Sequence, residues 1–264
     1  MPRRHPLTLL LAAAVLVTGL AAPSASVALD GTEVLPDLGM LPPKDFSVQS
    51  RPRGVRWLRF DSVVVNRGPG VFEVEGRGAA AAEAADGTLG VTQLVQTANG
   101  GRAEVASPAR MFFAGDGHDH WHVRDLQDWT IARTSDPGNV LNRGAKTGFC
   151  FWDNYRYGST AAAHYHPSTT SACEMETDGT VPMGLSVGWG DEYPSTIAFQ
   201  YIPITGLPNG EYVVTLVADP TSEALPRGEF VESNETNNTA WAVIRIHRKS
   251  VAVVSQGIGS PPGS

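Results

Sequence analysis

The clearest fold signal in the chain is VTQLVQTANGGRAEVA, residues 91–106. Residues 91–96 and 102–106 are rich in β-branched and apolar side chains and flank Ala98-Asn99-Gly100-Gly101. Asn-Gly between two such runs is the strongest short signal for a tight hairpin turn. The stretch therefore predicts two antiparallel strands, and Leu207-Pro208-Asn209-Gly210 predicts a second hairpin turn.

Similar strand-like segments recur along the rest of the chain, separated by Gly, Pro and Asn turns. The further predicted strands are residues 55–65, 71–74, 129–133, 197–204, 212–218 and 241–247. The one helix-prone run, residues 79–85, is short and lies between glycines, so we expect a loop or a single helical turn there. Many short strands of this kind predict an all-β fold, a β-sandwich with long irregular loops. Residues 31–53 and 154–190 lack strand character, and loops of this length are usually functional or disordered.

The two ends of the chain have their own patterns. Residues 1–28 combine Arg3-Arg4, an apolar run over residues 7–20 and small residues ending at Ala28, which is the layout of a secretory signal. The arginine pair also fits a twin-arginine signal, but the following residues match it only loosely, so we favour the general secretory route. Residues 29–248 are expected to form one domain. Residues 249–264 end in Gly, Ser and Pro and are expected to be a flexible tail.

Composition narrows the classes of partner. The net charge is −7 and falls by two more once Arg3 and Arg4 leave with the signal. An acidic shell argues against nucleic acid and suits cationic partners such as lysyl side chains or polyamines, although it equally serves solubility. No later window reaches the ~20 apolar residues of a membrane span. Cys150 and Cys173 form an even pair, which favours a disulfide in an oxidising compartment.

The most informative stretch for function is His118-Asp119-His120-Trp121-His122. Side chains alternate along a strand, so the three histidines are expected to share one face. Three imidazoles on one face form a ligand set for copper or zinc. The outer two histidines of a flat strand lie ~13 Å apart at Cα, so the segment should be twisted, bent or bulged. The histidines alone do not identify the metal, because hydrolytic zinc sites use the same set.

This cluster resembles the His-x-His-Tyr-His end of the copper motif of the lysyl oxidase family. Residues 146–153 are similar to the Lys-Ala-Ser-Phe-Cys-Leu-x-Asp stretch of that family. Further similar segments follow the family's order over roughly residues 35–246, namely 58–68, 184–186, 191–193, 200–205, 232–238 and 244–245. The resemblance implies an exported, copper-dependent oxidase. Such an enzyme converts primary amines to aldehydes with dioxygen and water, and releases ammonia and hydrogen peroxide.

The resemblance also assigns the reactive residues. His118, His120 and His122 match the copper ligands, and Lys146 and Tyr193 match the pair that becomes the lysine tyrosylquinone cofactor. Addition of the lysine to an oxidised tyrosine ring needs a neutral amine, so burial or nearby charge should lower the pKa of Lys146.

A carboxylate must remove a proton from the substrate carbon. Asp191 and Asp125 both match family aspartates, and the sequence does not decide between them. Asp191 has a simpler reading as a turn residue, and Asp125 as the partner that holds a histidine tautomer. Cys150 and Cys173 match two of the family's cysteines, and the others are missing here. Pro203 replaces a family aspartate, so no role transfers to that position.

A second metal site is implied by residues 232–238, which concentrate the oxygen ligands that calcium prefers. They resemble a Glu-Ser-Asp-Tyr-Thr-Asn-Asn segment that pairs with the entry segment of the family domain to hold calcium. The ligands implied are Asp37, the Leu38 carbonyl, Glu232, Asn234, Asn237 and Asn238. Asn234 replaces an aspartate, which should weaken affinity. The alternative is a polar hairpin loop with Asx turns.

These observations support three hypotheses from different classes. The leading one is an amine oxidase with copper and a quinone, acting on lysyl side chains, alkylamines or polyamines. The second is an exported copper-binding module that never builds the quinone. The third is a zinc hydrolase that uses metal-bound water on the same histidine face.

Overall fold

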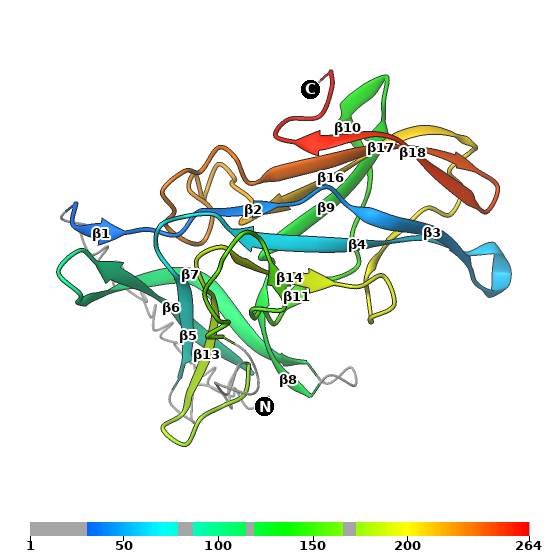
Figure 1. Ribbon diagram of the computed structural model, residues 1–264. Helices are drawn as coiled ribbons and strands as arrows, with labels where there is room; N and C mark the ends of the chain where they lie inside the picture. Colours follow the sequence, from blue (N-terminus) through cyan, green and yellow to red (C-terminus); the bar gives the residue numbers. More distant parts are fainter. Residues whose placement is uncertain (1–30, 79–86, 115–118, 166–172, 264) are drawn as a thin grey trace, which may run out of the picture.

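The computed structural model describes residues 31–78, 87–114, 119–165 and 173–263 (Figure 1). Strands dominate these ranges, and the one helical element within them is a 3-10 turn, η1, over Pro52–Gly54. The strands form three antiparallel sheets that share one core. The predicted all-β sandwich is therefore confirmed. The run 79–85, predicted as a loop or single turn, lies outside the described residues.

The seven-stranded sheet carries the predicted hairpin and the histidine strand. Its order is β11-β8-β7-β6-β5-β13, with β1 added beside β6. The hairpin of β6 and β7 closes through a hydrogen bond from Gly100 N to Thr97 O, as the Asn-Gly turn predicts. The strands are β1 (Glu33–Val34), β5 (Phe72–Arg77), β6 (Thr88–Thr97), β7 (Arg102–Ala114), β8 (His120–Arg124), β11 (Gly148–Phe149) and β13 (Thr180–Leu185).

The other two sheets contain the remaining strands. The five-stranded sheet has the order β10-β9-β16-β17-β18, and the six-stranded sheet has the order β12-β14-β4-β15, with β2 and β3 also paired to β4. The strands of the first are β9 (Gln127–Arg133), β10 (Asp136–Arg143), β16 (Gly210–Ala218), β17 (Thr239–His247) and β18 (Ser250–Ile258). Those of the second are β2 (Leu38–Met40), β3 (Lys44–Ser50), β4 (Arg56–Asn66), β12 (Tyr155–Arg156), β14 (Trp189–Tyr193) and β15 (Tyr201–Pro203).

Strand β4 is the central element of the core. In Figure 1 it crosses the middle of the molecule, with the five-stranded sheet above it and the seven-stranded sheet below. Phe60 of β4 is fully buried and packs edge-on against Trp129 of β9, with ring centroids 5.3 Å apart. Burying a side chain of this size stabilises the fold by about 1.5–3 kcal/mol. Because β4 also pairs with β14, this packing fixes the strand that carries Asp191 and Tyr193.

Several segments differ from the pattern that the sequence predicts. The long segments 31–53 and 154–190 contain five strands, of which the two-residue β1 and β12 are too short to show an alternating pattern. Residues 250–258 form β18, where the sequence predicts a flexible tail; they pair with β17 over its length, although most of their side chains are exposed at the sheet edge. The strand predicted over 197–204 is shortened to β15, because the chain turns before it.

Candidate active site

One cavity brings together five of the predicted catalytic and metal-binding residues. It measures about 260 Å³ and is lined, among others, by His120, His122, Lys146, Asp191 and Tyr193. The two histidines come from β8, the lysine from the loop before β11, and the last two residues from β14. Residues from three separate parts of the chain therefore face a single space.

The two described histidines converge on one point. The pairing of β8 with β7 places His120 opposite Ala114 and His122 opposite Phe112, so both side chains lie on the same side of the strand. Their Nε2 atoms are 2.9 Å apart. Two imidazole nitrogens that each lie ~2.0 Å from a metal, at right angles to each other, are separated by roughly 2.8 Å. The pair therefore fits a copper ion, whereas His118 lies outside the described residues.

Lys146 and Tyr193 meet although they are 47 positions apart. The Lys146 Nζ lies 5.4 Å from the centroid of the Tyr193 ring and 5.3 Å from that of Phe149. Both reactive residues are more than 90% buried. The Tyr193 hydroxyl donates a hydrogen bond of 2.7 Å to Cys150 O. Burial raises the pKa of Tyr193 well above its ordinary value, and the neighbouring Asp191 adds to this shift.

The two candidate bases occupy different environments. Asp191 is buried and accepts a hydrogen bond from Asn154 Nδ2. Burial raises the pKa of Asp191 well above its usual range, and the Tyr193 hydroxyl, the Asn154 amide and the Lys146 ammonium offset the shift only in part. Asp125 is exposed and lines a neighbouring cavity that Lys146 also borders, away from the two histidines. Asp191 therefore shares the histidine cavity and Asp125 does not.

A disulfide joins Cys150 to Cys173, as predicted. Both cysteines hold neighbouring site elements through their backbone carbonyls. Cys150 O accepts from the Tyr193 hydroxyl, and Cys173 O accepts from Trp121 N, between the two histidines of β8, at 2.9 Å. The bridge therefore links the histidine strand to the tyrosine.

Asn154 is a site residue that the sequence analysis misses. Its Nδ2 donates to Asp191, and its Oδ1 accepts from Glu192 N at 2.6 Å, so one amide holds both a side chain and the backbone of β14. The signal available in the sequence was its position directly after Asp153, the last residue of the family-like stretch. Asp153 itself is buried and accepts from the backbone and hydroxyl of Ser186, which anchors the loop that carries Asn154.

The residues of the predicted calcium site lie together with one exception. Glu232 accepts hydrogen bonds from Leu38 N and from Asn238 Nδ2, the latter at 2.8 Å. Asn237 Nδ2 donates to Asp37 Oδ2 at 3.0 Å. The exposed Asn234 instead turns its Oδ1 toward the backbone N and hydroxyl of Thr236, which is an Asx turn.

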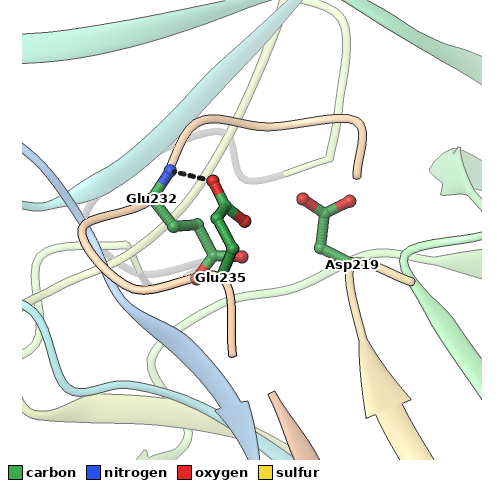
Figure 2. A group of neighbouring side chains, drawn as sticks. All are labelled: Asp219, Glu232 and Glu235. Carbon is green, nitrogen blue, oxygen red and sulfur yellow. Dashed lines mark hydrogen bonds between the residues drawn. The ribbon is translucent and has the colours of Figure 1, made fainter. Parts of the chain in front are cut away.

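Two further carboxylates in this region escaped the sequence analysis. Asp219, Glu232 and Glu235 each present an oxygen within 4.8 Å of the others (Figure 2). Asp219 follows β16 and Glu235 lies inside the acidic run, but neither position was distinguished by pattern. Among the described residues, Asp37 Oδ1, Asn237 Oδ1, Asn238 Oδ1 and Glu235 Oε2 are buried without a hydrogen-bond partner. Buried oxygens that lack donors fit an oxygen-ligated cation such as calcium.

Comparison of the sequence with known protein families identifies a family for this chain. The family model for lysyl oxidase matches residues 88–256, more than half of the chain. The chain belongs to the lysyl oxidase family. A search of curated proteins finds no match. The segment matched to lysyl oxidase contains the histidine cluster, Lys146, Asp191 and Tyr193, whereas β1 to β5 precede it. Within the described ranges no helix is long and apolar enough to cross a membrane.

The acidic cluster formed by Asp219, Glu232 and Glu235 predicts that the stability of the protein depends on pH. Burial raises the pKa of Glu232 to about 9 and that of Asp219 to about 7. The native state therefore binds more protons than the unfolded chain between about pH 4 and 9, so the stabilisation is full at the acidic end and is lost as pH rises. In chelator-treated protein the melting temperature should fall from pH 5 to pH 9.

The Glu232→Gln variant isolates the contribution of this carboxyl. Its melting temperature should fall less steeply over the same pH range, because one titrating group is gone. The slopes of melting temperature against pH are compared, and not the melting temperatures themselves. The reason is that a glutamine can accept only one of the two hydrogen bonds that Glu232 accepts from Leu38 N and Asn238 Nδ2. Glu211→Gln, at an exposed ion pair with Arg245, serves as the control. Equal slopes in all three proteins would contradict the prediction.

Proposed function

We propose that this member of the lysyl oxidase family is an exported copper-dependent amine oxidase. It converts a primary amine, dioxygen and water into an aldehyde, ammonia and hydrogen peroxide. The observation that carries the proposal is the single cavity shared by His120, His122, Lys146, Asp191 and Tyr193. A zinc hydrolase would need the histidines, but it would not need a buried lysine beside a buried tyrosine ring.

The chain offers residues for both expected cofactors. His120 and His122, with His118, would hold copper, and Lys146 and Tyr193 would form lysine tyrosylquinone. When bound, copper and the quinone supply the redox capacity for a two-electron oxidation that no ordinary side chain provides. The position of Lys146 Nζ, 5.4 Å from the centroid of the Tyr193 ring, supports this assignment, because the amine already lies beside the ring that it would join.

Asp191 is the proposed base. It shares the histidine cavity, and Asn154 holds one of its oxygens in a fixed position. It therefore lies in the same cavity as Lys146 and Tyr193, where the substrate carbon would be oxidised, whereas Asp125 does not line that cavity. Ile197 lines the same cavity, and the Phe149 ring packs edge-on against the Tyr193 ring with centroids 5.5 Å apart, so apolar groups border part of the site.

Export is proposed from the predicted signal over residues 1–28, which lie outside the described ranges. The disulfide supports it, because such bonds persist in oxidising compartments. After export and cleavage of the signal, the catalytic region would lie outside the cytoplasm, where it meets dioxygen and extracellular amines.

The decisive test is the covalent link between Lys146 and Tyr193. Peptide mapping of copper-reconstituted protein should show one crosslinked peptide that contains both residues. The peptide should be absent from the Lys146→Arg and Tyr193→Phe variants. Recovery of both residues in separate, unmodified peptides from protein that oxidises amines would mean that the cofactor assignment is wrong. The same result without amine oxidation would favour a copper-binding module, and metal analysis would separate copper from zinc.

A second test distinguishes the two aspartates. Asp191→Asn should lower kcat/KM for an alkylamine by about 10²–10⁴-fold, the usual contribution of a positioned general base. Asp125→Asn, the matched change in the neighbouring cavity, should change kcat/KM by less than about threefold. Intact mass and copper content of both variants are measured first, so that loss of the base is separated from failure to form the cofactor. A larger loss in Asp125→Asn would overturn the assignment.

We also propose that the Glu232 cluster binds calcium. The ligand atoms that the cluster offers are all oxygens, which suits a hard cation. A bound calcium ion would also relieve the electrostatic repulsion among the carboxylates. Calcium at a hundredfold excess over its Kd stabilises a native state by about 2.7 kcal/mol, so the melting temperature of chelated protein should rise on addition. Glu232→Gln should abolish the rise. Asn234→Ala should retain it, because the Asn234 side chain faces its own turn, and a melting curve indifferent to calcium would refute the site.

A further inference from the structure

A second cavity adjoins the candidate active site. It measures about 340 Å³ and shares His122 and Lys146 with the first cavity. The rest of its wall is mainly apolar and includes Phe112 of β7 and Phe199, which lies in the turn before β15. A substrate whose amine reaches Tyr193 past Lys146 would therefore leave its tail between two phenylalanine rings.

Phe199 is placed there at a cost to the fold. Its side chain is 45% exposed, so it gains little from burial. Its backbone has φ of +58°, a left-handed conformation that bulky residues rarely adopt and that glycine or asparagine adopts more easily. The strained backbone and the exposed ring of Phe199 both make the folded state less stable, so a contribution to stability does not explain this residue. Residues with a strained backbone are often found at functional sites.

The turn that carries Phe199 is firmly anchored. The next residue, Gln200, is fully buried, and its Nε2 donates to Phe60 O at 3.2 Å and to Ser62 Oγ at 3.0 Å. On the other side, Ile197 O accepts a 3.0 Å hydrogen bond from Arg59. The ring of Phe199 is therefore presented at a defined place at the cavity mouth.

The wall that Phe112 contributes lies next to a positive charge. The Phe112 ring meets His122 edge-on, with centroids 5.7 Å apart, and the Arg124 guanidinium lies 4.9 Å from the Phe112 centroid. The positive charge of Arg124 disfavours a second ammonium group nearby. None of the lining residues that the structure describes is a carboxylate that would compensate such a group.

We infer that this second cavity is a specificity pocket for the aromatic tail of a primary amine, and that Phe199 determines the preference. The inference rests on the proposed amine oxidase function and narrows its substrate class. Aromatic rings favour edge-to-face and offset contacts with one another beyond simple area burial. An aryl-alkyl amine therefore gains contacts that a plain alkylamine lacks, whereas a diamine brings a charge toward Arg124.

Turnover of three amines of similar reach tests the preference. The quinone-containing enzyme should give kcat/KM values in the order 4-phenylbutylamine, hexylamine, 1,6-diaminohexane, with the first about tenfold above the second. Phe199→Asn, which suits the left-handed backbone, should fold normally and reduce the phenylbutyl-to-hexyl ratio at least threefold. Phe199→Tyr keeps an aromatic ring, so this variant should retain the phenylbutyl-to-hexyl ratio of the unmodified enzyme. Val254→Ala, a change at an exposed apolar residue of β18, should leave it unaltered.

Binding of tertiary amines separates this inference from the catalytic proposal. 4-Phenylbutyldimethylamine and hexyldimethylamine cannot condense with a quinone, so calorimetry measures the pocket alone. The aryl compound should bind about tenfold more tightly, and Phe199→Asn should reduce the difference. If the enzyme oxidises amines but shows no aryl preference in either assay, the inference is wrong and the amine oxidase proposal stands. If no amine is oxidised, the oxidase proposal fails, and the binding ratio still decides whether the pocket recognises aromatic tails.

Discussion

The Cys150–Cys173 bridge is the constraint on which the arrangement of the site depends. It closes a separation of 23 residues, and a loop of that size contributes about 3 kcal/mol on the chain-entropy account. Its local effect is more specific, because Cys173 O holds Trp121 N of β8 and Cys150 O holds the Tyr193 hydroxyl. One covalent bond thus helps to fix the distance between the strand of the proposed metal ligands and the ring of the proposed cofactor. Hydrogen bonds such as that from Asn66 Nδ2 of β4 to Leu185 O of β13 join the seven-stranded and six-stranded sheets as well, and the bridge adds a covalent tie beside the site.

Both proposed sites contain ionisable side chains that are buried. Lys146, Asp191 and Tyr193 are each less than 10% exposed, and so is Glu232. Removing ionisable groups from water is unfavourable unless partners compensate, and the compensation here is incomplete. Such groups gather where a protein binds ions or performs chemistry, because reactivity requires them to be desolvated. The large aromatic core around β4 supplies the stability that allows it.

The local parts of this structure could be predicted from the sequence, and the long-range parts could not. The hairpin of residues 91–106 and the shared face of His120 and His122 follow from turn chemistry and strand alternation. The meeting of Lys146 with Tyr193 depends on pairing between distant strands, so the residues alone gave no reason for it and only the family resemblance did. Asn154, Asp219 and Glu235 were missed because their roles arise from contacts that no local pattern encodes. Asn234 shows the converse, since a ligand-like residue satisfies its own turn instead.

Several of the positions where the backbone breaks local rules lie around the proposed sites. Non-glycine residues with positive φ include Asp119 beside the histidines, Cys173 of the bridge, Phe199 at the second cavity and Asp219 of the acidic cluster. Natural sequences agree with their local propensities except where function requires otherwise. The agreement is good along β6, β7, β16 and β17, which build the sheets. Asp45 within β3 is an exception, but the four positions named above lie in loops that the sheets hold in place, so the sandwich supports the strained turns near the proposed sites.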